Sequence, residues 1–109
     1  MGRAEGPHEQ SLMTANEIAA HLLESCESLS RFDSYMFGST LRGIGQDIDI
    51  LVVGPGGNAL SQLKEEMRSA GEKLPLHVLY MLPSEMSRTE FVARENCVPL
   101  AHLTSPTMS

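Results

Sequence analysis

One stretch, FGSTLRGIGQDIDILVV at residues 37–53, constrains this chain more than any other part of its sequence. Residues 47–53 have the apolar, β-branched composition of a strand, yet two aspartates stand at its head. Side chains alternate between the two faces of a strand, so Asp47 and Asp49 leave the same face, about 6.6 Å apart at their origins. Carboxylates in an apolar strand cost folding free energy unless a cation or solvent relieves them. The stretch therefore predicts a functional site at the start of a strand.

Asp47 and Asp49 are the candidate metal ligands. Two carboxylates at this spacing can reach one hard cation, or two cations about 3.5–4 Å apart, as in phosphoryl chemistry. Gly38 and Ser39 end the preceding apolar run: the glycine lets the backbone approach an oxygen-rich ligand, and the serine hydroxyl can donate to a phosphate. Arg42 can add a positive charge there. This combination favours a site for a cation and a phosphate.

Each of these residues also has a purely structural interpretation. Asp47 and Asp49 can be solvated carboxylates at a strand end, and Gly38 can be a turn residue. Ser39 can be a helix cap, and Arg42 is equally well explained as an exposed loop charge. The functional interpretation is favoured because the glycine–serine pair and the two aspartates occur together, at this distance, after a strand.

The rest of the sequence predicts one small α+β domain. Its mixed β-sheet has about three strands, with helices mainly on one face. Flexible tails are expected at residues 1–11 and 104–109, on either side of a domain at 12–103. An apolar segment, Val98 to Leu103, would be a dimer or partner contact if it does not pack on its own domain. The elements predicted in chain order are a helix at about 15–30 after a capping box at Thr14–Glu17, strands at 35–37 and 47–53, a helix capped by Asn58 and ended before Gly71, a strand at 76–82, and a helix from Ser84 or Ser87 to about Asn96.

Composition and charge disfavour several classes of function. The chain has 109 residues and a formal net charge of -6, so long nucleic acid is disfavoured as a partner. It has neither a signal peptide nor a segment of membrane-spanning length, which predicts a cytoplasmic protein with no membrane partner. Cys26 and Cys97 lack the spacing of a metal site and are expected to be buried free thiols.

The same stretch resembles the nucleotidyltransferase superfamily whose best-known member is DNA polymerase beta, especially its minimal single-domain bacterial members. The family pattern is an aromatic or apolar residue, Gly-Ser, a short loop with Arg-Gly, and Asp-x-Asp before an apolar strand. This sequence has FGS at 37–39, RG at 42–43 and DID at 47–49. The predicted order of helices and strands extends the resemblance, and with it the polymerase beta palm-like fold, over about residues 15–96.

The resemblance implies an activity and a set of ligands. Gly38 and Ser39 would hold the phosphates of a nucleoside triphosphate such as ATP, and Asp47 and Asp49 would hold Mg²⁺, or Mn²⁺. A nucleotidyl group would pass to an acceptor hydroxyl. The chain has no room for its own acceptor-binding domain, so a partner must present that hydroxyl, and the negative charge favours a protein. Minimal bacterial members often neutralise a helical ribonuclease toxin, which implies an antitoxin-like role; whether the chain forms a homo-oligomer is left open.

His77 is the main departure from the family pattern. The family's third carboxylate lies on the third strand, where this sequence has KLPLHVLYMLP with no Asp or Glu. A neutral imidazole is a poor ligand for Mg²⁺ but can act as a general base, or can simply be a polar residue near a cleft. Glu85 and Glu90 are the carboxylates that could fold back instead. Two hypotheses follow: an enzyme with catalytic Asp47, Asp49 and His77, or a catalytically degenerate binding module of the same fold.

Overall fold

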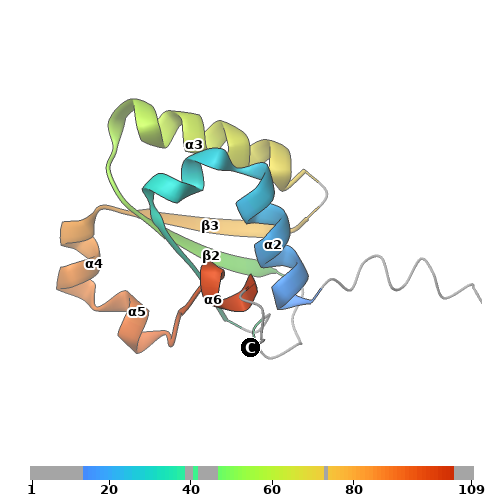
Figure 1. The fold of residues 1–109 in the computed structure, drawn as a ribbon. Helices are drawn as coiled ribbons and strands as arrows, with labels where there is room; N and C mark the ends of the chain where they lie inside the picture. The colour runs from blue at the N-terminus through green and yellow to red at the C-terminus, as the bar shows by residue number, and fades with distance from the viewer. Residues whose placement is uncertain (1–13, 39–40, 42–46, 73, 105–109) are drawn as a thin grey trace, which may run out of the picture.

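The computed structural model describes residues 14–38, 41, 47–72 and 74–104, which form one small β-sheet with helices packed on it (Figure 1). The sheet contains β1 (Asp33–Phe37), β2 (Ile48–Val53), β3 (Leu76–Met81) and β4 (Val98–Pro99). The helices are α2 (Ala15–Ser25), the 3-10 helix η1 (Glu27–Arg31), α3 (Gly57–Ala70), α4 (Pro83–Thr89), α5 (Phe91–Arg94) and α6 (Leu100–Thr104).

The sheet is mixed, as the sequence predicts. Its strand order is β3-β2-β1-β4. β1 pairs antiparallel with β2 and with β4, whereas β3 runs parallel to β2. A parallel connection between neighbouring strands needs a crossover, which α3 provides. The expected α+β class is confirmed, with a fourth strand added at the C-terminal end.

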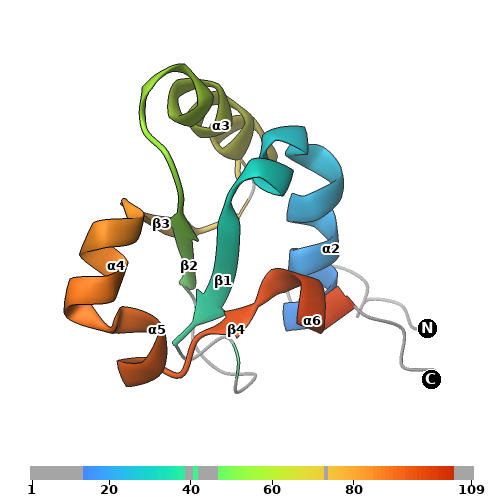
Figure 2. The same ribbon diagram turned by 60° about the vertical axis from the view of Figure 1, so that its left-hand side comes forward.

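Strand β2 lies inside the sheet and is buried over most of its length. Its even-numbered residues Ile48, Ile50 and Val52 belong to the main core, beneath α2 and α3. Figure 2 shows α2, α3 and α6 gathered on this side of the sheet. The largest side chains with no solvent exposure are Leu22, Met36, Ile50, Leu51, Leu63 and Leu100.

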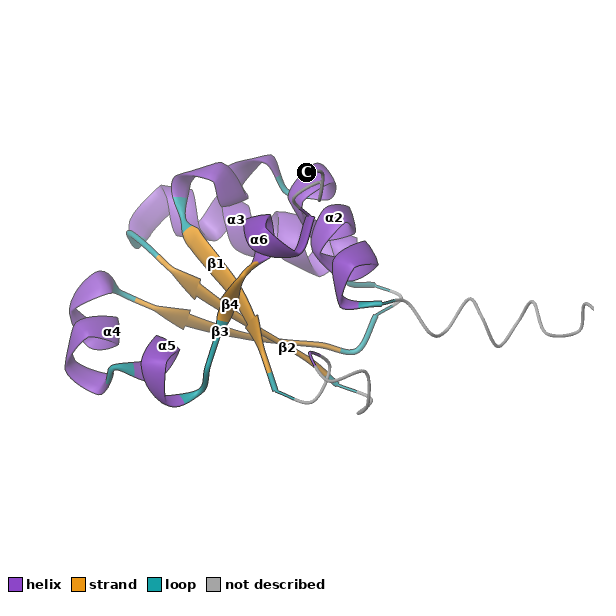
Figure 3. Cartoon of the chain, turned by 60° about the horizontal axis from the view of Figure 1, so that its bottom comes forward, coloured by secondary structure: helices purple, strands orange, loops and turns teal. Residues whose placement is uncertain are grey.

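The odd-numbered residues of β2 face the opposite side of the sheet. Figure 3 shows α4 and α5 on this side, at one end of the strands. Leu51 and Val53 are buried, but Asp49 at the start of the strand keeps 30% of its side chain exposed. This face is therefore covered along part of β2 and open to solvent where the aspartates lie.

The apolar segment at residues 98–103 packs on its own domain. Val98 and Pro99 pair with Met36 and Tyr35 of β1, and Leu100 is fully buried in the core. The condition for a dimer or partner contact is thus not met by this segment. Thr104 ends α6; the rest of the expected C-terminal tail and the N-terminal tail at 1–11 lie outside the described residues.

The first helix is shorter than the sequence predicts, because a side chain from α3 intervenes. α2 ends at Ser25, and η1 follows as a separate 3-10 helix. The Glu66 carboxylate accepts both the backbone N–H and the hydroxyl of Ser28, each at 2.9 Å. In a continuous α-helix that N–H would donate to the carbonyl of Glu24. Glu66 therefore links α3 to η1 through Ser28.

Two other helix boundaries differ from the prediction. α3 begins at Gly57 with Gly56 as its N-cap and no side-chain capping bond, so Asn58 is not the cap. The last predicted helix is divided into α4 and α5 by Glu90, whose φ of 54° is left-handed. A right-handed helix cannot continue through that conformation. The expected end of α3 before Gly71 is confirmed.

We predict that Glu66→Gln lowers the melting temperature more than Glu65→Gln, its matched control on the same helix. The hydrogen bonds from Ser28 lower the pKa of Glu66 below its usual value of 4.5. A carboxyl whose folded pKa is depressed stabilises the fold above its unfolded pKa, and that contribution is lost as the pH falls through the folded value. Melting curves should show the largest difference between wild type and Glu66→Gln at neutral pH, and a shrinking difference below about 4.5. An equal difference at pH 7 and pH 3 would contradict this role.

Candidate functional site

The pairing of three strands brings Phe37, Asp49 and His77 to one level of the sheet. Asp49 is the register partner of His77 in the parallel β2–β3 ladder and of Phe37 in the antiparallel β1–β2 ladder. Directly paired residues point to the same face. The three side chains therefore share the face opposite α2 and α3, at its open end.

The imidazole of His77 lies between the two aspartates. Its Nε2 is 3.9 Å from Oδ2 of Asp47, and its Nδ1 is 4.0 Å from Oδ1 of Asp49. Both distances exceed hydrogen-bond length, and 63%, 58% and 30% of the His77, Asp47 and Asp49 side chains are exposed. Ion pairs this exposed contribute little to stability. The sequence-based prediction that the aspartates share a face agrees with this geometry.

Gly38 supports the Asp49 carboxylate directly. Its φ is +86°, and a Cβ atom at this position would lie 2.4 Å from Oδ2 of Asp49. Only glycine combines this backbone conformation with so close an approach. The Leu41 amide donates to the Gly38 carbonyl at 3.2 Å.

The aromatic ring of Phe37 borders the site and connects it to α5. Its centroid is 5.0 Å from that of Phe91, with the rings at 83° to one another. Such an edge-to-face contact is the preferred geometry of an aromatic pair. The left-handed Glu90 just before Phe91 turns the chain into α5 and thereby sets where this ring lies. No local sequence pattern predicts this long-range contact.

The remaining predicted site residues have different outcomes. Ser39 and Arg42 lie outside the described residues, so their roles stay predictions. Glu85 accepts the backbone N–H of Leu82 at 2.8 Å, at the opposite end of β3 from His77, and does not replace the third carboxylate. Glu90 is exposed at the junction of α4 and α5, and its side chain makes no ion pair or hydrogen bond with any described residue.

The donor set of the site suits a hard divalent cation in part. Asp47 and Asp49 offer carboxylate oxygens, which Mg²⁺ and Mn²⁺ prefer, and His77 adds a nitrogen that Mn²⁺ accepts more readily. Within the described ranges, no group of three or more His, Cys, Asp and Glu side chains is arranged as a complete metal centre. Glycine at position 38 leaves the oxygen of Asp49 accessible where a side chain would fill the space. The two aspartates therefore fit the role of cation ligands.

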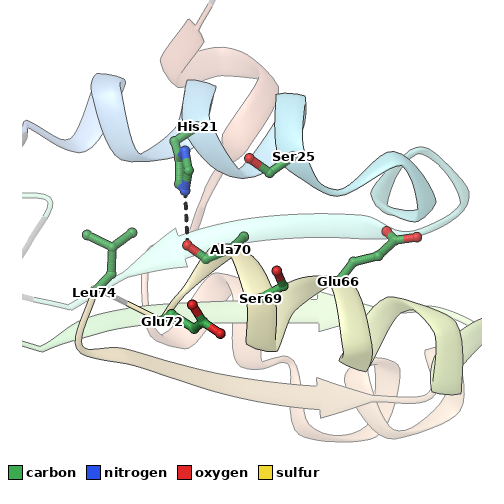
Figure 4. A pocket seen from close by; sticks show the side chains of 7 residues that line it. All are labelled: His21, Ser25, Glu66, Ser69, Ala70, Glu72 and Leu74. Atoms are coloured by element: carbon green, nitrogen blue, oxygen red, sulfur yellow. Dashed lines mark hydrogen bonds between the residues drawn. The ribbon is translucent and has the colours of Figure 1, made fainter.

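A cavity of about 500 Å³ lies elsewhere, between α2 and α3. Figure 4 shows His21 reaching across it, with Nε2 3.0 Å from the carbonyl oxygen of Ala70. His21 is half-buried. The cavity is on the helix-covered side of the sheet, away from Asp47, Asp49 and His77. It is thus separate from the predicted site.

Residues 19–98 match the family model of the nucleotidyltransferase domain, and the chain belongs to that family. The resemblance seen in the sequence is thereby confirmed, with the α+β fold that it implies. Membership supports nucleotidyl transfer as the general activity and a nucleotide as the substrate class. A comparison with curated protein sequences gives no match. None of the helices in the described part of the chain is long and apolar enough to cross a membrane.

We predict that Gly38→Ala is much more harmful than Gly57→Ala. Both glycines have positive φ, at 86° and 75°, but a Cβ at Gly57 would meet nothing within 4 Å. Gly57→Ala isolates the backbone strain, about 1–2 kcal/mol, whereas Gly38→Ala adds the collision with Asp49, about 1–3 kcal/mol more. Urea unfolding measures both values. In the background of Asp49→Ala the excess cost of Gly38→Ala should disappear; an unchanged excess would locate the strain elsewhere.

Proposed function

We propose that this protein transfers a nucleotidyl group from a nucleoside triphosphate to a hydroxyl of a partner protein, with Mg²⁺ or Mn²⁺ bound at Asp47 and Asp49. The observation that carries the proposal is the approach of both aspartates to His77 on the open face of a nucleotidyltransferase domain. Nothing on this face covers the three side chains completely, since each is at least 30% exposed.

The residues around the aspartates supply binding and orientation. Gly38 has no side chain where a Cβ would lie 2.4 Å from Oδ2 of Asp49, and the triphosphate is proposed to bind beside this carboxylate. Ser39 and Arg42 follow in the chain and are the proposed donors to its phosphates. A divalent cation held by the two aspartates would neutralise charge on the reacting phosphate and on the leaving group. Phe37, bordering the site, offers an apolar surface beside it.

His77 is the proposed proton acceptor. The acceptor oxygen forms a bond to the α-phosphorus, the bond from that phosphorus to the bridging oxygen of the β-phosphate breaks, and pyrophosphate leaves. The hydroxyl proton passes to the imidazole of His77, whose ring nitrogens lie 3.9 and 4.0 Å from the carboxylates of Asp47 and Asp49 and therefore beside the proposed cation site.

A protein is the favoured acceptor. The net charge of -6 disfavours long nucleic acid as the acceptor. An antitoxin-like role, in which the modified partner is a ribonuclease toxin, is the specific form that the resemblance suggests. Cytoplasmic location remains part of the proposal.

The second candidate is a degenerate domain that binds a nucleotide and a partner without turnover. It is favoured by His77 itself, which stands where the family has a third carboxylate and which is 63% exposed. An exposed imidazole fixes a metal-bound acceptor less firmly than a carboxylate would. The two candidates share the site and differ only in whether product forms.

The test uses each α-labelled nucleoside triphosphate with Mg²⁺ or Mn²⁺ and the protein encoded by the neighbouring gene. We expect label on that protein with the wild type, and a loss of at least about 100-fold with Asp47→Asn or Asp49→Asn, since each removes a cation ligand. Glu65→Gln, which removes an exposed carboxylate outside the site, serves as the control. Tight, cation-dependent nucleotide binding without product would favour the degenerate module.

Replacement of His77 separates the two candidates further. If the imidazole takes the proton, His77→Ala should lower the transfer rate by about 10²- to 10⁴-fold with little change in nucleotide affinity. His77→Asp restores the family's third carboxylate and should retain or raise transfer. Single-turnover rates measure both. Transfer that is absent in the wild type and appears in His77→Asp would identify a domain degenerate at this one position.

A further inference from the structure

Strand β3 forms one edge of the sheet and lacks the usual protection of an edge. It pairs with β2 on one side, and no strand among the described residues pairs with its other side. Its sequence, LHVLYM, contains no proline and no Lys, Arg, Asp or Glu. The other edge strand, β4, is only two residues long and contains Pro99. Natural proteins protect exposed edges by short strands, prolines and charges, so β4 is protected and β3 is not.

The backbone of β3 can be assigned residue by residue. The carbonyl of Pro75 accepts from Ile48 N–H, and that of Met81 accepts from Gly54 N–H, so odd-numbered residues are turned toward β2. Backbone groups alternate in direction along a strand, and Val78 and Tyr80 therefore direct both N–H and C=O outward. Neither residue has a further hydrogen-bond partner in the described chain. Outward groups of this kind are the recognition element for an added strand.

A groove runs beside this edge on the side of α3. Its volume is about 440 Å³, and its lining includes Lys64 and Arg68 of α3, Glu72 just after α3, and Leu76, Val78 and Tyr80 of β3. The Lys64 ammonium lies 5.2 Å from the centroid of the Tyr80 ring. Lys64 and Arg68 thus outnumber the one carboxylate, Glu72, in the lining of a largely apolar groove.

The charged side chains that line the groove favour a negatively charged occupant. A second copy of this chain, paired symmetrically through β3, would bring the same excess of cations, Lys64 and Arg68 over Glu72, to both sides of the interface. Arg68 pairs with Glu65 at 3.3 Å, but both side chains are at least 70% exposed and the pair is weak. An extended segment with a carboxylate on the helix side complements this surface, and apolar side chains there fit Val78 and Leu76. The open-face side of the same edge carries Leu79, which is 38% exposed.

We propose that β3 is the docking edge for an extended, acidic segment of the partner protein, which adds as a fifth strand and pairs with Val78 and Tyr80. Neighbouring strands lie about 4.8 Å apart, so a side chain of that segment on the open face lies directly beside His77. Resting on the proposed function, we assign the acceptor hydroxyl to a Ser, Thr or Tyr at this position. The docked segment and the nucleotide then meet from opposite sides of His77.

The test uses a defined probe, a fluorescein-labelled, acetylated peptide of nine residues. It has threonine at odd positions and valine at even positions, with glutamate in place of one of the two middle valines. Fluorescence anisotropy without nucleotide measures binding. Two further peptides carry N-methyl groups on all odd or all even residues. Strand addition uses N–H groups of one parity only, so one methylated peptide should bind at least about tenfold more weakly than the other. Absent binding, or equal binding of the two, would overturn the proposal.

Variants of the protein test whether an acidic segment of a partner occupies the groove. Lys64→Glu/Arg68→Glu should weaken the peptide at least fivefold, whereas Arg31→Glu/Arg94→Glu, with the same change of charge outside the groove, should not. Equal weakening by both double variants would show that Lys64 and Arg68 do not recognise the peptide and would overturn the proposal. Light scattering gives the mass in solution, and a dimer dissociated by Leu79→Lys would show that a second copy occupies the edge and overturn the partner assignment.

Peptide binding and nucleotidyl transfer are measured separately, so that failure of one can be told from failure of the other. Asp47→Asn/Asp49→Asn should bind the peptide as tightly as the wild type, because neither residue belongs to the edge. With labelled nucleoside triphosphate, label on a threonine of the peptide is expected for the wild type only. Binding without any label would count against the transfer function and would uphold the docking edge.

Discussion

The parallel pairing of β2 with β3 is the interaction on which the site and its surroundings depend. Its register sets Ile50 beside Val78 under α3 and sets Asp49 beside His77 on the opposite face. A slip of one residue would exchange the two faces and bury the aspartate and the imidazole beneath the helices. The apolar residues on the helix side therefore fix the position of the polar ones. Core packing and site geometry are two consequences of one register.

The position of the aspartates along β2 explains how the fold tolerates them. Leu51, two residues after Asp49 on the same face, is fully buried, whereas Asp49 is 30% exposed and Asp47 is 58% exposed. Exposure thus rises toward the start of the strand, away from the end where α4 begins. A carboxylate placed at Leu51 would lose its hydration without a partner, at a cost of several kcal/mol. The site occupies the part of the strand where charge is least costly.

The sequence predicted the elements whose signals are local. The strands at 35–37, 47–53 and 76–82 correspond to β1, β2 and β3 with ends moved by one or two residues. β4 was not predicted as a strand, because a two-residue bridge is defined by its pairing with β1 and has no pattern of its own. The end of α2 was missed because the decisive carboxylate, Glu66, is about 40 residues away in the chain.

In the candidate site, too, the features with local signals could be predicted from the sequence and the long-range contacts could not. The shared face of Asp47 and Asp49 follows from strand alternation, and the place of His77 follows from the expected third strand. The contact between Gly38 and the Asp49 carboxylate could not be predicted, because the sequence shows that a glycine is present but not which side chain lies over it. The pairing of Phe37 with Phe91 likewise depends on the left-handed Glu90, a conformation with no sequence signal here.

Alternation along β3 separates the two activities that we assign to it. Odd-numbered residues bond to β2 and direct side chains to the open face, where His77 belongs to the site. Even-numbered residues direct side chains to the helices and backbone groups to the free edge, where Val78 and Tyr80 belong to the docking surface. A change at His77 can therefore remove turnover without altering the edge. An enzyme and a degenerate module of this fold would consequently recognise the same partner segment, and loss of the third carboxylate does not imply loss of the partner.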